Sequence, residues 1–145
     1  MGHDSIEPFI GNPGKGAFIL CKTSNPGSGD LQDIEVRSNG TDRTLFLHVA
    51  QLARGWNTRD NVGLVVGATY PETLTRVRSV TPDQWILVPG IGAQGGDLES
   101  SLRAGLRSDG SGLLINVSRG IARAADPAYA AAEWRQNIER HRRPA

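Results

Sequence analysis

The chain has 145 residues, of which 16 are basic and 15 acidic, so its formal net charge is +1. This length allows one domain with a real hydrophobic core, but a complete eight-stranded β/α barrel needs roughly 250 residues. The near balance of charge argues against a nucleic-acid partner, and no apolar run approaches the roughly 20 residues of a membrane span. We therefore expect a single domain over residues 1–145 that acts on neither nucleic acid nor membranes.

Cysteine and histidine usage limits the metal and redox chemistry of the chain. Cys21 is the only cysteine, which excludes an internal disulfide and a thiolate metal cluster. Cys21 lies in an apolar run, so we expect it to be buried rather than nucleophilic. His3, His48 and His141 are far apart and lack ligand spacing, so we expect no bound metal. A cytoplasmic location is the default expectation for such a sequence.

The first part of the chain predicts a helix, a strand and a polar loop. Asp4 or Ser5 would cap a short helix near the N-terminus. Residues 17–22 form an apolar run typical of a strand. Residues 23–29 combine hydroxyl, amide and glycine groups, which suit a polar ligand but also make an ordinary turn. Residues 30–43 are polar and predict an exposed excursion.

A second helix and strand follow. Helical periodicity indicates a buried face made of Leu45, His48, Val49 and Leu52. His48 near this face is better explained as a structural partner than as a catalytic base. Residues 61–68 predict a second buried strand, and Pro71 is well placed to begin the next helix. The expected packed face of that helix consists of Leu74, Val77 and Val80.

A glycine-rich loop follows the third predicted strand. Residues 85–88 are short and apolar, as expected for a parallel strand covered on both faces. Residues 90–96 contain four glycines, which permit positive φ angles and close approach of a ligand, and an acidic helix start follows. Free N–H groups at such a turn favour an anion, and Gln94 could orient a polar ligand. From this loop alone, an ordinary strand-to-helix turn is an equal alternative.

A second loop of the same kind strengthens the prediction of an anion site. Residues 113–117 predict a fourth strand, which ends in Ser118 and Arg119 before a final helix that starts at Pro127. In an eight-stranded β/α barrel, the phosphate site lies between the loops after the seventh and eighth strands. Arg119 would be the cation whose planar fork matches a phosphate.

Four strand-helix units in succession predict an α/β fold with a parallel sheet. Because four strands cannot close an eight-stranded barrel, we predict a partial (β/α)8 TIM barrel. Such a sheet would leave two unpaired edges and an uncovered barrel interior, both of which favour association.

Five motifs, in this order, resemble the C-terminal half of orotidine 5'-phosphate decarboxylase in its longer bacterial form. Residues 1–9 resemble the segment after the fourth barrel strand. The ends of the fifth to eighth strands are matched by Lys22-Thr-Ser-Asn-Pro-Gly, Val65-Val-Gly-Ala-Thr, Val88-Pro-Gly-Ile-Gly-Ala-Gln-Gly-Gly and Asn116-Val-Ser-Arg-Gly-Ile. The resemblance implies roughly the last four strand-helix units of a TIM barrel. It also implies decarboxylation of orotidine 5'-phosphate to uridine 5'-phosphate in pyrimidine biosynthesis, without metal or organic cofactor, at a site shared across a homodimer interface.

Carried over residue by residue, the resemblance assigns binding roles to five positions. It implies that Ser24 hydrogen-bonds the pyrimidine, that Gln94 bridges the pyrimidine and the phosphate, and that Arg119 binds the phosphate. Ser118 and the backbone near Gly95 complete that pocket by position.

The sequence departs from the family in its catalytic residues. The Asp-x-Lys-x-x-Asp pattern of the family is absent, and Lys15 and Lys22, the only two lysines, match no catalytic position. The groups that transfer the proton would have to come from residues upstream of Met1 or from another polypeptide. As a partner we expect either a second copy in a homodimer or a complementing N-terminal half. We therefore assign no catalytic residue and expect this chain alone to bind substrate without turnover.

Two alternatives stay open from the sequence. One is a non-catalytic half-barrel that binds a nucleotide phosphate or acts as a dimerisation module. The other is a different phosphate-binding barrel enzyme that converged on similar loops, for which the joint match of Ser24 and Gln94 would be accidental.

Overall fold

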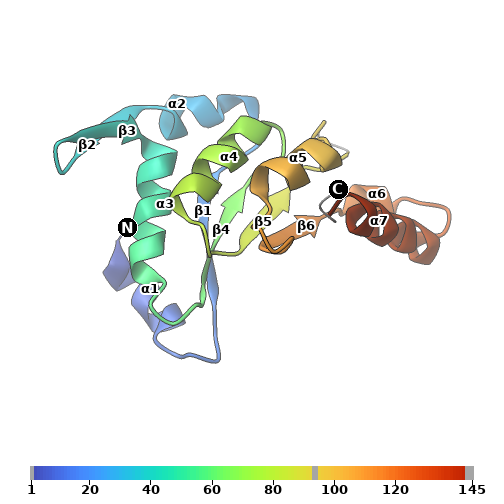
Figure 1. Cartoon of the computed structure of the whole chain (residues 1–145), viewed down its shortest axis with the longest axis horizontal. Helices are drawn as coiled ribbons and strands as arrows, with labels where there is room; N and C mark the ends of the chain where they lie inside the picture. Colours follow the sequence, from blue (N-terminus) through green and yellow to red (C-terminus); the bar gives the residue numbers. More distant parts are fainter. Residues whose placement is uncertain (1, 93–94, 143–145) are drawn as a thin grey trace.

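The computed structural model describes residues 2–92 and 95–142. Its elements, in chain order, are α1 (His3–Ile10), β1 (Ala17–Lys22), η1 (Pro26–Ser28), α2 (Gly29–Gln32), β2 (Glu35–Ser38), β3 (Thr41–Thr44), α3 (Leu45–Trp56), β4 (Val62–Val66), α4 (Pro71–Val80), β5 (Ile86–Pro89), α5 (Leu98–Gly105), β6 (Leu113–Asn116), α6 (Arg119–Ala122) and α7 (Pro127–Arg142). Four strands form a parallel sheet in the order β1-β4-β5-β6 (Figure 1). Within these ranges, no helix is long and apolar enough to cross a membrane.

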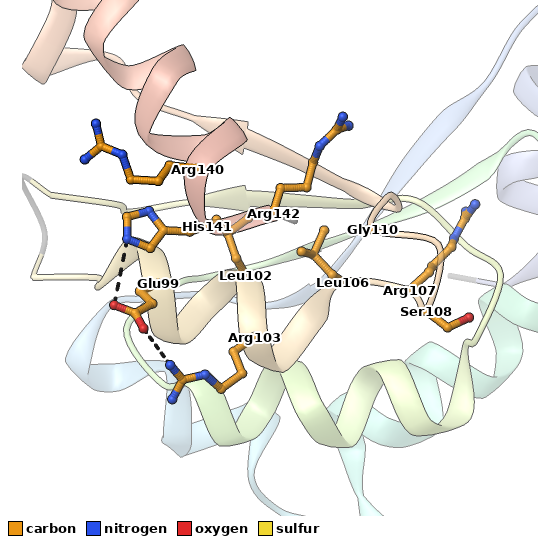
Figure 2. Close-up of a pocket in the computed structure, with 10 residues that line it drawn as sticks. All are labelled: Glu99, Leu102, Arg103, Leu106, Arg107, Ser108, Gly110, Arg140, His141 and Arg142. Carbon is orange, nitrogen blue, oxygen red and sulfur yellow. Dashed lines mark hydrogen bonds and ion pairs between the residues drawn. The ribbon is translucent and has the colours of Figure 1, made fainter. Parts of the chain in front are cut away.

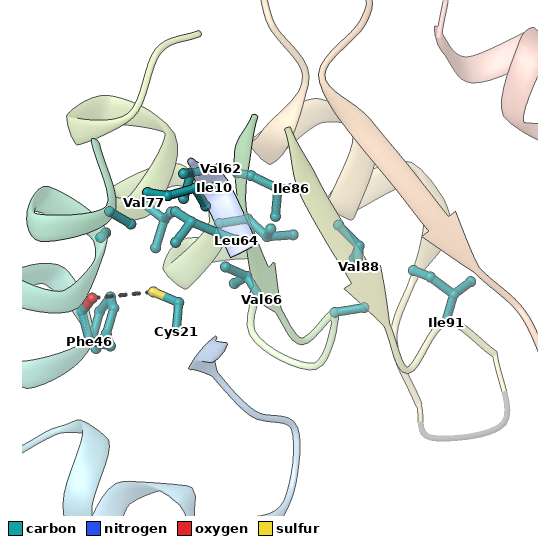
Figure 3. Close-up of a cluster of buried hydrophobic side chains, with 14 residues drawn as sticks. Ile10, Cys21, Phe46, Val62, Leu64, Val66, Val77, Ile86, Val88 and Ile91 are labelled. Atoms are coloured by element: carbon teal, nitrogen blue, oxygen red, sulfur yellow. Dashed lines mark hydrogen bonds between the residues drawn. The ribbon is translucent and has the colours of Figure 1, made fainter. Parts of the chain in front are cut away.

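Helices cover one face of this sheet. α3, α4 and α5 lie side by side in that order (Figure 1), and the hydrophobic core fills the space between them and the strands (Figure 3). The predicted packed face of α4 is confirmed, because Leu74 and Val77 are fully buried and Val80 packs against the core at partial exposure. The fold is thus a set of four strand-helix units of a (β/α)8 barrel, as the sequence predicted.

Two rows of side chains cross the sheet in register and face in opposite directions. The row that packs among the helices is Ile19, Leu64, Ile86 and Leu113. The next row is Leu20, Val65, Leu87 and Leu114. Since successive side chains of a strand alternate between faces, this second row points away from the helices. Leu20 is 58% exposed and Leu114 is 42% exposed, which confirms the expected uncovered barrel interior.

The predicted buried face of α3 is wrong. The residues that α3 buries are Phe46, Ala50 and Ala53, whereas Leu52 is 40% exposed. Phe46, Ala50 and Ala53 recur at the spacing of one helix face, and the two alanines let the helix approach the sheet closely. The sequence interpretation followed the larger aliphatic side chains, and these lie on the neighbouring stripe.

The polar segment expected to be an exposed excursion is partly ordered into secondary structure. It contains the short helix α2 and an antiparallel hairpin, β2–β3, which projects beside the start of α3 (Figure 1). Asn39 and Gly40 connect its strands with φ angles of 52° and 76°. Asn-Gly is the preferred pair for a two-residue hairpin turn, which requires positive φ at both positions.

The start of the first helix also differs from the prediction. α1 begins at His3, and Gly2 occupies its N-cap position without a side-chain capping bond. Neither Asp4 nor Ser5 is the cap. Asp4 instead lies in the first turn, where a carboxylate is stabilised by the helix dipole.

Arg78, near the end of α4, joins the segments at the amino-terminal edge of the sheet. Its guanidinium donates hydrogen bonds of 2.7 to 3.0 Å to four backbone carbonyls, those of Thr81, Gln84, Gly105 and Gly112. Burial, together with nearby Arg107, lowers the pKa of Arg78 to about 10. The side chain therefore stays charged at neutral pH and connects α4, α5 and the starts of β5 and β6.

We predict that Arg78→Lys lowers the free energy of unfolding by about 3 kcal/mol, because an ammonium group cannot match the planar fork that bonds to these carbonyls. Urea unfolding followed by circular dichroism measures the change. Arg103→Lys is the matched control, since Arg103 is 77% exposed and pairs with Glu99; it should cost less than about 1 kcal/mol. Equal losses in the two variants would contradict the role given to Arg78.

Candidate functional site

The loops that follow the four parallel strands meet along one edge of the sheet. Backbone hydrogen bonds connect them, because Gly67 N donates to Lys22 O and Ala68 N donates to Pro89 O, both at 2.9 Å. This is the carboxyl edge of the strands, where ligands bind in β/α barrels. Polar groups from β1, β4, β5 and β6 are thereby brought together.

The glycine loop after β5 has the conformation that the sequence predicted. Gly90, Gly92 and Gly95 have φ angles of 99°, 72° and 85°. Gly96 allows close packing instead, because a Cβ there would lie 2.6 Å from Ala68 Cβ and 2.7 Å from Gly90 O. The loop therefore lies directly against the end of β4.

Asp97 follows this loop as the N-cap of α5. Its carboxylate accepts a hydrogen bond of 2.7 Å from the backbone N–H of Ser100, and that bond lowers the pKa of Asp97. The capping bond fixes where the helix begins. The end of the glycine loop is anchored as a result.

A pocket of about 100 Å³ lies between the loops after β5 and β6. The residues that line it are Pro89, Gly90, Ile91, Asn116, Ser118, Arg119 and Gly120. The Ser118 hydroxyl donates to Asn116 Oδ1 at 2.9 Å, which orients Ser118 at the pocket wall. Since a water molecule occupies about 30 Å³ of liquid, this space suits an anion of phosphate size. It lies where the sequence predicts an anion.

Two hydroxyl groups near the ends of β1 and β4 have no hydrogen-bond partner within the described ranges. Both Ser24 Oγ and Thr69 Oγ1 are buried. Ser24 Oγ lies against Gly67, where a Cβ would overlap it. Because an unpaired buried hydroxyl costs free energy, such groups are typical of a site at which a ligand supplies the missing partner.

The loop that carries Ser24 is held by its neighbours. Thr23 N donates to Gln32 Oε1 at 2.9 Å, and Lys22 Nζ donates to Asp33 Oδ1 at 2.7 Å. Lys22 is only 4% exposed. Its bond to Asp33 and the bond from Thr23 to Gln32 both connect the end of β1 to the end of α2, so we interpret this lysine as a structural tether.

The predicted site residues do not all lie in one pocket. Ser118 and Arg119 share one pocket, whereas Ser24 follows β1, which β4 and β5 separate from β6. Gly95 lies in the loop between them, and Gln94 falls outside the described residues. Sequence reasoning gave no role to Gly67, Thr69 or Asn116, although all three stand in motifs that it had recognised.

A larger pocket, of about 570 Å³, lies away from the strand ends, between α5 and α7 (Figure 2). It carries five basic side chains, those of Arg103, Arg107, Arg140, His141 and Arg142. Figure 2 shows the guanidinium groups of Arg103, Arg140 and Arg142 pointing in different directions. Glu99 is paired with Arg103 at 2.5 Å and lies 3.9 Å from His141. Because these cations do not converge, we place the candidate site at the strand ends.

Cys21 is buried, as the sequence predicted. It is 2% exposed, and its Sγ donates to Phe46 O at 3.2 Å (Figure 3). Burial raises the pKa of the Cys21 thiol to about 12. The thiolate is therefore scarce at neutral pH, and Cys21 is not a nucleophile. Among the residues that the structure describes, no group of three or more His, Cys, Asp or Glu side chains could hold a metal ion.

The fold and the pocket together define a class: part of a (β/α)8 barrel with a phosphate-sized pocket at the carboxyl edge of its strands. Residues 1–134 match the model of the orotidine 5'-phosphate decarboxylase / HUMPS family. The chain belongs to that family.

Curated relatives and solved structures agree with this membership. The chain is 54% identical to orotidine 5'-phosphate decarboxylase of Roseiflexus castenholzii over 83% of its own length and 44% of the relative's, and 52% identical to that of Paracidovorax citrulli over 91% and 48%. A solved structure of Leishmania donovani OMP decarboxylase superposes with a TM-score of 0.89 at 55% identity, covering 98% of this chain and 54% of that one. The chain thus spans about half the length of the curated relatives that it matches.

The contact between Gly67 and Ser24 gives a prediction for the site. A Cβ on Gly67 would overlap the Ser24 hydroxyl and lie 2.9 Å from the Ser24 nitrogen, so Gly67→Ala should destabilise the fold by about 1 to 3 kcal/mol. Gly55→Ala on α3 is the control, because nothing lies within 4 Å of its Cβ position. It should stabilise the chain by about 0.5 to 1 kcal/mol. Urea midpoints measure both, and a neutral Gly67→Ala would refute the close contact.

Proposed function

We propose that this chain is the substrate- and phosphate-binding half of an orotidine 5'-phosphate decarboxylase. That enzyme is a cofactor-independent carboxy-lyase that converts orotidine 5'-phosphate to uridine 5'-phosphate and CO2 in pyrimidine biosynthesis. The observation that carries the proposal is the pocket at Ser118 and Arg119, on the carboxyl edge of strands that belong to this family. The names of the curated relatives support it. We propose a single domain over residues 1–145 and a cytoplasmic location.

In this proposal the nucleotide lies across the carboxyl edge of the sheet. Arg119 binds the phosphate with its planar fork, and Ser118 and the backbone near Gly95 complete the phosphate pocket. Ser24 supplies a hydrogen bond to the pyrimidine, which would satisfy its buried hydroxyl. Gln94 would bridge the pyrimidine and the phosphate. Binding of the remote phosphate contributes to catalysis only when it is coupled to a reacting centre.

The reacting centre has no lysine from this chain. Lys22 is buried and paired with Asp33, and Lys15 precedes β1, so it lies toward the amino-terminal edge of the strand. A lysine that protonates the product carbanion would therefore come from outside residues 1–145, either from residues upstream of Met1 or from another polypeptide.

The uncovered face of the sheet is where those residues would pack, whether they precede this sequence or belong to another polypeptide. The apolar row from Leu20 to Leu114 points away from the helices and is exposed at both ends. β1 and β6 are the two edge strands of the sheet. We propose that the occupant is a complementing β/α half, because eight strands close a barrel filled with side chains. The relatives, which are about twice as long as this chain, support this choice.

The test is a decarboxylation assay, followed by the loss of orotidine 5'-phosphate absorbance. The purified chain is assayed alone and mixed with a separately expressed N-terminal half of the Paracidovorax citrulli relative. We predict activity only in the mixture, because the chain binds the nucleotide while its partner supplies the proton-transfer groups.

The matched control in the mixture is Arg119→Ala, which should raise KM at least about tenfold through loss of a charge-assisted hydrogen bond. Turnover by the chain alone would show that the proton-transfer groups lie within this chain, contrary to the proposal. No turnover in either sample, with uridine 5'-phosphate still bound, would favour the second candidate, a non-catalytic half-barrel that binds a nucleotide phosphate. The structural pairing of Lys22 is the observation that keeps this candidate open.

A further inference from the structure

One side chain outside the pocket contacts both of the loops that form it. Trp134 lies in α7, and its Cη2 and Cζ2 atoms are 3.4 and 3.5 Å from the position that a Cβ on Gly92 would occupy. Its Nε1 is 3.4 Å from the corresponding position on Gly120. The indole ring therefore lies beside Gly92 of the loop after β5 and Gly120 of the loop after β6, at van der Waals distance from the point where a side chain on either glycine would begin.

These are the two walls of the phosphate-sized pocket. Gly90 and Ile91 belong to the first wall, and Ser118, Arg119 and Gly120 to the second. Glycine stands at both of these positions, so neither residue places a side chain of its own between its backbone and the ring. The position of the ring is thereby linked to the width of the gap between the walls.

The ring is held in place by the rest of the fold. Trp134 is partly buried and packs against the hydrophobic core, and α7 packs on both α5 and α6. A large aromatic ring with only two rotatable side-chain bonds makes a stiffer spacer than an aliphatic side chain of similar bulk. The distance between the two loops thus depends on Trp134, which does not itself line the pocket.

We propose that Trp134 is a positioning residue for the phosphate group, which fixes the spacing of the two loops so that one anion contacts both. This inference rests on the proposed function of the pocket as a phosphate site. A bound phosphate must reach donors on both walls at hydrogen-bond distance, and a displacement of about 1 Å is enough to lose much of such an interaction.

The test measures the affinity of the purified full chain for uridine 5'-phosphate by calorimetry. Trp134→Ala should weaken binding at least about tenfold, whereas Trp134→Phe, which keeps an aromatic spacer, should stay within about threefold of the unmodified chain. Trp56→Ala is the matched control, because Trp56 ends α3 and also packs on the core at partial exposure. It should lose stability without a comparable loss of affinity.

A double-mutant cycle separates positioning from a general structural effect. If Trp134 acts through the phosphate contact of Arg119, then Trp134→Ala should weaken binding much less in the Arg119→Ala background than in the unmodified chain. Full additivity of the two substitutions would overturn the proposal. If Trp134→Ala does not fold, as judged by circular dichroism, then Trp134→Leu replaces it with the same expected direction.

The outcomes also distinguish this inference from the proposed function. Equal affinities of Trp134→Ala and the unmodified chain would overturn the inference alone. If the unmodified chain does not bind uridine 5'-phosphate at millimolar concentration, the pocket is not a phosphate site, and both the proposed function and the role of Trp134 are contradicted. If binding depends on Trp134 but the chain gives no decarboxylation with a complementing half, the inference about Trp134 is supported and the proposed decarboxylase function is contradicted.

Discussion

The parallel pairing of four strands is the constraint on which the rest of the structure depends. Because β1, β4, β5 and β6 run in the same direction, their carboxyl ends fall on one edge, and the loops at that edge carry Ser24, Gly95, Ser118 and Arg119. Backbone bonds such as that from Ala68 N to Pro89 O then hold neighbouring loops in place. The opposite edge is joined by the partly buried guanidinium of Arg78. The proposed ligand site and the Arg78 hydrogen bonds thus lie at opposite ends of the same strands, as binding and stability do in complete barrels.

The same pairing explains why the chain has half the features of an enzyme. A closed barrel places its inward side chains in a packed interior, whereas four strands leave the row from Leu20 to Leu114 open. The proposed phosphate pocket is lined by residues of two neighbouring loops of this chain. Chemistry at the pyrimidine would also need groups from strands that lie across the barrel. The proposed division between binding and turnover would follow from this topology, and the match to about half of each curated relative is consistent with it.

Much of the fold could be predicted because its signals are local. Short apolar runs between turns predicted all four parallel strands, and the glycine loop was correctly given positive φ angles at Gly90, Gly92 and Gly95. One error arose where packing decides, because alanines rather than leucines face the core on α3. The other was a local signal that was missed, because the Asn39-Gly40 pair organises the polar segment into a hairpin. Trp134 was placed in the last helix but given no role. Its contacts with two loops distant in sequence become visible only in three dimensions.

Binding of the nucleotide phosphate at the carboxyl edge of this chain can be tested by titrating the 15N-labelled chain with uridine 5'-phosphate and following the backbone amides by NMR. We expect the largest shifts at Gly90, Gly92 and Gly120, with a smaller change at Ser24. Shifts concentrated instead along the basic pocket between α5 and α7, at Arg103 and Arg140, would contradict it.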